Sequence, residues 1–193
     1  MYFNVYSTNF TLEDHITKAG LEVKVERKYY LLTKVDKKEK VSMLEGGGVG
    51  RLAPSAGPTP SAQRVEKYER TELADLSKLK SGDLVEIEMS IDSKDDYEYL
   101  IFEDFKPAGF EPLLVRSGYN FNEMGEMGAY MELRDEKVCF FVRQLARGHH
   151  SMSYRMRAEI PGRFSALPTK GYAMYAPELK GNSEEIKLIV EDK

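Results

Sequence analysis

Apolar and polar side chains alternate along most of this chain with a period of two residues. In residues 151–160, every second position is apolar, and serine, arginine or glutamate stands between them. The same alternation runs through residues 21–26, 85–91 and 129–134, and less cleanly through 186–190. A period of two places successive side chains on opposite faces of a strand. Because one face is apolar and the other charged, the pattern predicts half-buried antiparallel strands.

The alternation also predicts which side chains of residues 151–160 are buried. Those expected to face the core are Met152, Tyr154, Met156 and Ile160, and those expected to face solvent are Arg155 and Arg157. The same reasoning places Leu21, Val23 and Val25 together on one apolar face.

Turn-forming residues separate the predicted strands. The turn segments are Lys80-Ser81-Gly82-Asp83, Asp135-Glu136-Lys137, Arg147-Gly148-His149-His150 and Pro161-Gly162. We expect strands near residues 3–11, 21–35, 65–72, 84–92, 97–104, 110–116, 128–134, 138–145, 151–160, 163–168 and 185–191. Short strands at regular spacing predict an all-β fold, an antiparallel β-sandwich. The only helical turn we expect lies in residues 12–16, with Thr11 as its cap.

Residues 42–63 interrupt the strand pattern. They contain Glu-Gly-Gly-Gly-Val-Gly at 45–50, followed by Pro54, Pro58 and Pro60. Such a segment has little apolar surface to offset the entropy of ordering it, so we expect a mobile loop. The glycines do not form a nucleotide-binding motif, because prolines rather than a helix follow them and no Gly-Lys-Ser/Thr is present.

Composition and charge exclude several classes of protein. The chain has 193 residues, with 28 Lys and Arg against 32 Asp and Glu, for a net charge of −4. This balance argues against a nucleic-acid-binding role that depends on neutralising phosphates. No apolar run is long enough to span a membrane. The N-terminus lacks the basic start and apolar stretch of a signal peptide.

The charge is unevenly distributed. Between Glu66 and Asp104, thirteen acidic and five basic residues give a net charge of −8. Between Arg143 and Arg163, five arginines and one glutamate give +4. Two interpretations are open: the charges pair across neighbouring strands, or they orient docking against another domain.

None of the residues with catalytic or metal-binding chemistry forms a recognisable site. Cys139 is the only cysteine and stands in an apolar run, so we expect a small buried residue and no disulfide. His149 and His150 are adjacent, so on a strand they point to opposite faces and cannot easily share a metal. The acidic residues 92–96 do not fit a calcium loop and predict a polar hairpin connection. No Gly-x-Ser-x-Gly occurs. We therefore expect no enzyme activity, no cofactor and no metal site.

Two segments rich in large side chains suggest contact with a partner. Residues 117–130 combine glycines with aromatic and methionine residues, which is typical of a long hairpin connection or of a partner-contacting loop. Residues 166–178 carry Tyr172, Met174 and Tyr175 between Pro168 and Pro177. We expect this second segment to be a loop, either tucked into the core of its own domain or inserted into a partner.

Several blocks of the sequence resemble the C-terminal region of bacterial alpha-2-macroglobulins. They are residues 4–14 (NVYSTNFTLED), 80–103 (KSGDLVEIEMSIDSKDDYEYLIFE), 106–112 (KPAGFEP), 128–135 (GAYMELRD), 154–168 (YRMRAEIPGRFSALP) and 173–183 (AMYAPELKGNS). The resemblance implies that residues 1–18 are the returning strand of a CUB-like domain. It implies that residues 19–193 are the last macroglobulin-like domain, a β-sandwich of immunoglobulin- or fibronectin-like architecture.

The resemblance also implies a function. Members of this family are broad-spectrum protease inhibitors, periplasmic or at the cell surface, that trap proteases through a thioester. The thioester motif Cys-Leu-Glu-Gln is absent, so Cys139 is not the thioester cysteine. The last domain of the family packs on the thioester domain and shields its bond with a Met-Tyr pair, which Met174 and Tyr175 match, next to Tyr172. The expected partners are therefore the thioester domain and other domains of a parent protein, with target proteases as indirect partners.

Two other classes of protein compete with this expectation. One is an autonomous β-sandwich that binds a protein or glycan through its loops. The other is a hydrolase on a jelly-roll scaffold, which would need a convergent polar pocket that the sequence does not reveal.

Overall fold

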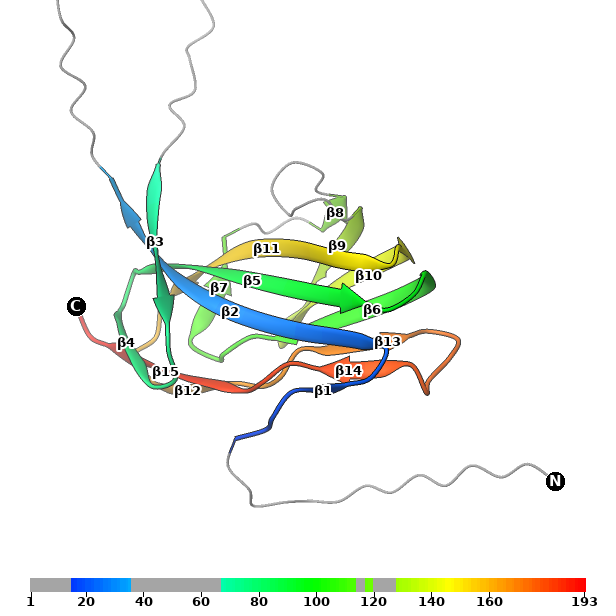
Figure 1. Ribbon diagram of the computed structural model, residues 1–193. Coiled ribbons are helices and arrows are strands. Elements are labelled where there is room, and N and C mark those ends of the chain that lie inside the picture. Colours follow the sequence, from blue (N-terminus) through cyan, green and yellow to red (C-terminus); the bar gives the residue numbers. More distant parts are fainter. Residues whose placement is uncertain (1–14, 36–66, 114–116, 120–127) are drawn as a thin grey trace, which may run out of the picture.

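The computed structural model describes residues 15–35, 67–113, 117–119 and 128–193. These residues form fifteen strands in three sheets, and the all-β expectation is confirmed. Figure 1 shows the arrangement of the strands. The predicted strand at 3–11, most of the helical turn at 12–16 and the glycine- and proline-rich loop at 42–63 lie outside the described residues. No helix capable of crossing a membrane occurs in the described ranges.

The largest sheet has seven strands, and all of its neighbouring strands are antiparallel. In spatial order they are β1 (Ala19–Gly20), β14 (Lys180–Asn182), β13 (Lys170–Ala173), β6 (Tyr97–Phe105), β10 (Lys137–Leu145), β9 (Ala129–Leu133) and β8 (Gly118–Tyr119). β9 and β10 form the hairpin that the polar link at 135–137 predicted, closed by a hydrogen bond from the Arg134 N–H to the Lys137 carbonyl (2.9 Å).

The second sheet has five antiparallel strands, which lie in the order β3 (Tyr68–Leu73), β2 (Val23–Lys34), β5 (Leu84–Ser93), β11 (Gly148–Ala158) and β7 (Phe110–Pro112). A third sheet contains β12 (Gly162–Ala166), β15 (Ile186–Glu191) and β4 (Ser77–Lys80). In this third sheet β15 and β4 run parallel, so the pairing is not antiparallel throughout.

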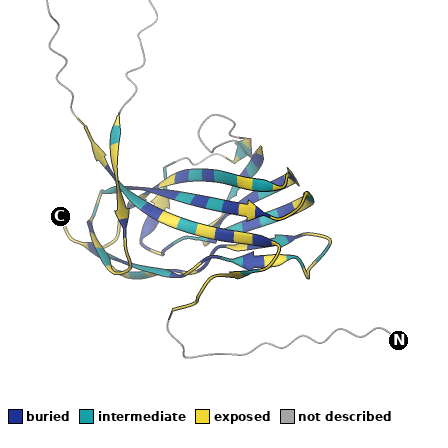
Figure 2. Ribbon diagram, viewed as in Figure 1, coloured by how far each residue is buried: buried dark blue, intermediate teal, exposed yellow. Residues whose placement is uncertain are grey.

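Most of the core residues come from the two large sheets, and the third sheet adds Leu79, Ala166, Leu188 and Val190. Figure 2 shows the buried residues along the strands. Alternate residues of β5 and β11 are fully or almost fully buried, as the period of two predicted: Val85, Ile87, Met89, Ile91, Met152, Tyr154 and Met156. The seven-stranded sheet contributes Phe102 and Phe140, and the Phe140 ring lies 5.6 Å from the ring of Tyr154 on the other sheet. Each such side chain stabilises the fold by about 1.5–3 kcal/mol through burial.

Two side chains that the alternation placed inward are exposed. Ile160 is 58% exposed, because β11 ends at Ala158 and the alternation of faces ends with it. Leu21 is 79% exposed, because it lies in the short connection between β1 and β2. Both predictions were wrong for the same reason: a period of two holds only while the backbone remains an extended, paired strand.

The chain connections also differ from prediction in three places. The segment 166–178 was expected to be a loop, but it contains β13 and leads into β14, which form a hairpin. His149 and His150 lie within β11 rather than in a turn. The acidic segment 92–96 consists of the last two residues of β5 and the connection to β6. Because β5 and β6 belong to different sheets, it is not a hairpin within one sheet.

Cys139 is buried on β10, as predicted, and burial raises the pKa of its thiol. Since the thiolate is the reactive form, the folded chain should react with a thiol-specific disulfide reagent at pH 8 far more slowly than the chain unfolded in urea. Stopped-flow absorbance on both states measures the two rates, with free cysteine as the control for any effect of urea on the chemistry. Equal rates would contradict the burial of this side chain.

Candidate functional site

The hairpin formed by β13 and β14 holds the residues that the sequence singled out. Its end is closed by hydrogen bonds from the Ala173 N–H to the Leu179 carbonyl (3.0 Å) and from the Leu179 N–H to the Ala176 carbonyl (2.9 Å). The Met174 N–H donates to the carbonyl of Tyr99 on the neighbouring strand β6 (2.8 Å). We call residues 174–178 the hairpin tip. The hairpin is drawn in orange in Figure 1.

The predicted site residues are at the surface. Tyr175 is 81% exposed and Met174 is 38% exposed, while Tyr172 on β13 is half-buried. The tip therefore does not fill the core of its own domain, which was one of the two expectations for this segment. The ring of Tyr175 packs edge-on against the ring of Tyr99, with 5.5 Å between centroids and an interplanar angle of 79°.

A row of apolar side chains crosses the seven-stranded sheet from this hairpin. The strand register aligns five residues on the face away from the core, in the order Tyr172, Ile101, Phe141, Tyr130 and Tyr119. Neighbouring rings in the row lie 5.1 Å apart for Tyr119 and Tyr130 and 6.3 Å apart for Tyr130 and Phe141. We call this set the outer aromatic row. It provides an apolar surface that continues from the hairpin.

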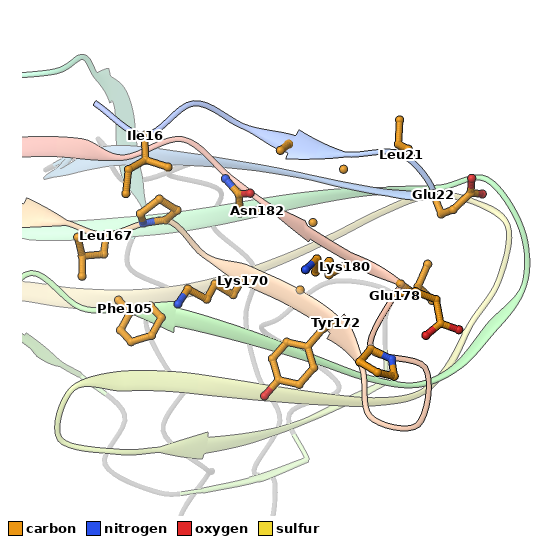
Figure 3. Close-up of a pocket in the computed structure, with 17 residues that line it drawn as sticks. Ile16, Leu21, Glu22, Phe105, Leu167, Lys170, Tyr172, Glu178, Lys180 and Asn182 are labelled. Carbon is orange, nitrogen blue, oxygen red and sulfur yellow. The ribbon is translucent and has the colours of Figure 1, made fainter. Parts of the chain in front are cut away.

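A groove of about 920 Å³ lies beside the same hairpin (Figure 3). Phe105, Lys170 and Tyr172 line one side of it, and Leu21 and Glu22 line the other. The Lys170 ammonium lies 5.3 Å from the centre of the Phe105 ring. The walls are mainly apolar, which suits an apolar ligand.

A buried ion pair fixes the base of the hairpin. The Arg27 guanidinium on β2 donates to the Asp104 carboxylate on β6 at 2.5 Å, and the two side chains are 1% and 0% exposed. The hydroxyls of Tyr154 and Thr169 donate to the two oxygens of the same carboxylate, at 2.6 and 2.8 Å. Burial, and next the charge of Asp104, raise the pKa of Tyr154 well above its usual value, so this hydroxyl stays protonated and remains a donor.

The same guanidinium reaches both ends of the hairpin. It donates to the carbonyls of Ala166 and Leu167, which precede β13, at 2.9 and 2.8 Å, and to the carbonyl of Glu184, which follows β14, at 3.3 Å. Thr169 and Ser183 close the base through two further hydrogen bonds. We call this arrangement the Arg27–Asp104 clasp. It ties the hairpin to both large sheets.

Several of the unevenly distributed charges form ion pairs between neighbouring strands. Glu86, which the alternation placed on the polar face, is buried between Arg155 on β11 (3.0 Å) and Arg70 on β3 (3.1 Å). Arg70 also pairs with Glu88 at 2.7 Å. These contacts correspond to the first interpretation of the charge pattern, pairing across the sheet.

The other candidates for chemistry remain apart. Within the described ranges, no three His, Cys, Asp or Glu side chains lie close enough to hold a metal ion. His150 contacts the Ala146 carbonyl through its Nε2 (2.7 Å), and His149 is exposed.

The sequence singled out Tyr172, Met174 and Tyr175, which lie together on the β13–β14 hairpin, but it did not point to Tyr99 or the Arg27–Asp104 clasp. A signal for the clasp was present. Arg27 occupies the inward position between Val25 and Tyr29, and Asp104 follows Leu100 and Phe102 at the next inward position of β6. Opposite charges at two core-facing positions predict a buried pair.

Comparison with known proteins gives a consistent result. Residues 59–178, more than half of the chain, match the family model described as the bacterial alpha-2-macroglobulin MG10 domain. An alpha-2-macroglobulin homologue from Nostoc sp. is 27% identical over an alignment of 121 residues, and the match covers 58% of this chain and 6% of the relative.

Solved structures of two alpha-2-macroglobulins have the same fold. The Salmonella protein reacted with methylamine is 20% identical over 91% of this chain, with a TM-score of 0.58. The Escherichia coli protein in its native conformation is 17% identical over 94% of this chain, with a TM-score of 0.60. This chain covers 10% of each of those two chains, so it corresponds to a small part of them.

Proposed function

Because this chain belongs to the family of bacterial alpha-2-macroglobulin MG10 domains, we propose that it is a non-catalytic domain of a larger protease inhibitor, in which it packs on a thioester domain and shields the thioester. Met174 and Tyr175 form the shield, and Tyr172 supports it from β13.

The observation that carries this proposal is the exposure of Met174 and Tyr175 on a hairpin with a fixed base. Apolar side chains held away from their own core have surface to bury against a partner. A thioester survives in water only where water and amines are kept away from it, and a thioether beside an aromatic ring excludes both. The Tyr175 hydroxyl also supplies a hydrogen-bonding group at the contact.

The outer aromatic row supports the same arrangement. Its members, from Tyr172 to Tyr119, place five large apolar side chains next to one another on the outer face of the seven-stranded sheet. Aromatic residues are enriched in the buried centres of protein interfaces. We infer that this face contributes to the contact with other domains of the parent protein.

The remaining functional assignments follow from the same proposal. The chain contains no Cys-Leu-Glu-Gln motif, so the reactive acyl group belongs to another domain and target proteases are indirect partners. The Escherichia coli relative has been solved after activation by porcine elastase, which indicates the class of enzyme to test. The proposed location is the periplasm or the cell surface.

The test is the double variant Met174→Ala/Tyr175→Ala in the full-length inhibitor that carries this domain. Methylamine, the amine with which the Salmonella relative was treated, should release the thioester thiol severalfold faster than in the wild type. The melting temperature should be nearly unchanged, because substitutions at exposed positions usually change stability by about 0.5 kcal/mol or less. Thiol release and thermal unfolding are measured on the same samples.

Ile160→Ala is the matched control, because Ile160 is also an exposed apolar residue but lies outside the hairpin. It should alter neither the release rate nor the melting temperature. An unchanged release rate in a folded double variant would rule out the shield and would favour the alternative, an autonomous β-sandwich that binds a protein or glycan through its loops.

A further inference from the structure

We propose that Tyr99 is a positioning residue for the hairpin tip: its ring and its carbonyl hold Tyr175 and Met174 in the orientation in which they meet a partner surface. The inference rests on the proposed function for the identity of that partner. The position of Tyr99 on β6 and its two contacts with the tip do not depend on that function.

One residue contacts both members of the tip pair. The Tyr99 carbonyl accepts a hydrogen bond from the Met174 N–H at 2.8 Å, and the Tyr99 ring meets the Tyr175 ring edge-on at 5.5 Å. Edge-to-face packing is a preferred geometry of aromatic pairs, because the positive edge of one ring faces the negative face of the other. The backbone of Met174 and the side chain of Tyr175 are therefore both held from the same point on β6.

The backbone of Tyr99 is unusual for an aromatic residue in a strand. Its φ is +56°, in the left-handed region that favours glycine. The ladder between β10 and β6 contains the pairs Val142–Leu100 and Gln144–Glu98, which lie on either side of this residue. A strained conformation persists only where the surrounding structure maintains it, and such residues are concentrated at functional sites.

Stability of the fold does not explain a tyrosine at this position. The side chain is 40% exposed, and glycine would adopt the same φ without strain. The Tyr99 ring packs against the ring of Tyr175, a residue that is itself 81% exposed. The strain at Tyr99 is therefore tied to a contact at the surface rather than to the core.

Positioning is what a shield built from two side chains requires. An exposed tyrosine has rotational freedom that it must lose on docking, and a side chain already held in its bound orientation loses less. The Arg27–Asp104 clasp fixes the base of the hairpin, whereas Tyr99 acts at its tip. The two contacts together determine where the shield lies.

The experiment compares Tyr99→Gly with Tyr99→Phe. Glycine accepts the positive φ and keeps the carbonyl that binds the Met174 N–H, so the substitution removes the side chain while the local backbone conformation stays accessible. Phenylalanine keeps the ring and is the matched control. In this chain labelled with carbon-13 at its tyrosine rings, the Tyr175 ring signals should move toward free-tyrosine shifts in Tyr99→Gly and stay in place in Tyr99→Phe. In the full-length inhibitor, Tyr99→Gly should release thiol faster with methylamine, and Tyr99→Phe should match the wild type.

Two results would overturn the inference. Tyr175 signals and a methylamine rate that are both unchanged in Tyr99→Gly would show that the ring positions nothing. A large fall in melting temperature in Tyr99→Gly but not in Tyr99→Phe would show that the ring stabilises the fold instead.

If the proposed function is wrong, the double variant Met174→Ala/Tyr175→Ala leaves the methylamine rate unchanged. The Tyr175 ring signals in Tyr99→Gly then still show whether Tyr99 orients that side chain.

Discussion

Replacing Asp104 with alanine should destabilise the folded chain by about 3–5 kcal/mol, the usual cost of removing one partner of a buried ion pair. The variant leaves the Arg27 guanidinium, which is 1% exposed, without its counter-charge. It also leaves the buried hydroxyls of Tyr154 and Thr169 without their acceptor. Since domains are stable by only about 5–15 kcal/mol, this is a large fraction of the total.

Urea unfolding followed by circular dichroism measures the effect, and Asp92→Ala is the control. Asp92 is an exposed aspartate on β5, so its loss should change the free energy of unfolding by about 0.5 kcal/mol or less. Because the cost in Asp104→Ala comes from an unpaired charge, adding Arg27→Met should destabilise by less than the sum of the two single variants. A cost for Asp104→Ala similar to that of Asp92→Ala would contradict the buried pair.

Replacing Met156 with alanine should cost about 2–5 kcal/mol, the range for a large-to-small change in a packed core. Met156 is fully buried on β11, where it lies opposite Val85 on β5 and Pro112 on β7. Removing its side chain leaves a cavity in the core beside β5, β11 and β7. The fixed pairing on both sides limits how far the backbone can close it.

Ile160→Ala provides the comparison within the same segment. Ile160 has the same parity as Met156 in the sequence, but it is 58% exposed beyond the end of β11. Its truncation should change the free energy of unfolding by about 0.5 kcal/mol or less. Equal costs for the two variants in urea would mean that the alternation continues past Ala158, and a reversed order would mean that the strand register is shifted by one residue.

The strands of the core could be predicted from the sequence, because their signal is local. The alternation in β5 and β11 depends only on each residue and the one two positions away, so it identified the buried faces correctly. Residue types and the resemblance to a family also singled out Met174 and Tyr175 as candidate contact residues, and this remains a prediction. Their segment was expected to be a loop, but it belongs to the β13–β14 hairpin. The alternation was wrong at Leu21 and Ile160, because local pattern does not reveal where pairing stops.

Only the tertiary structure decided which residues meet across strands. Arg27 and Asp104 are 77 positions apart. The outer aromatic row joins residues of the consecutive strands β8, β9 and β10 to residues of β6 and β13, which lie elsewhere in the sequence. Tyr99 reaches Tyr175 because β13 pairs on one side with β14 and on the other with β6, a strand far from it in the sequence. Sequence by itself determined the period of each strand and hence its faces. Sheet order and register, which arise from packing of the whole chain, determined the clasp, the row and the positioning of the tip.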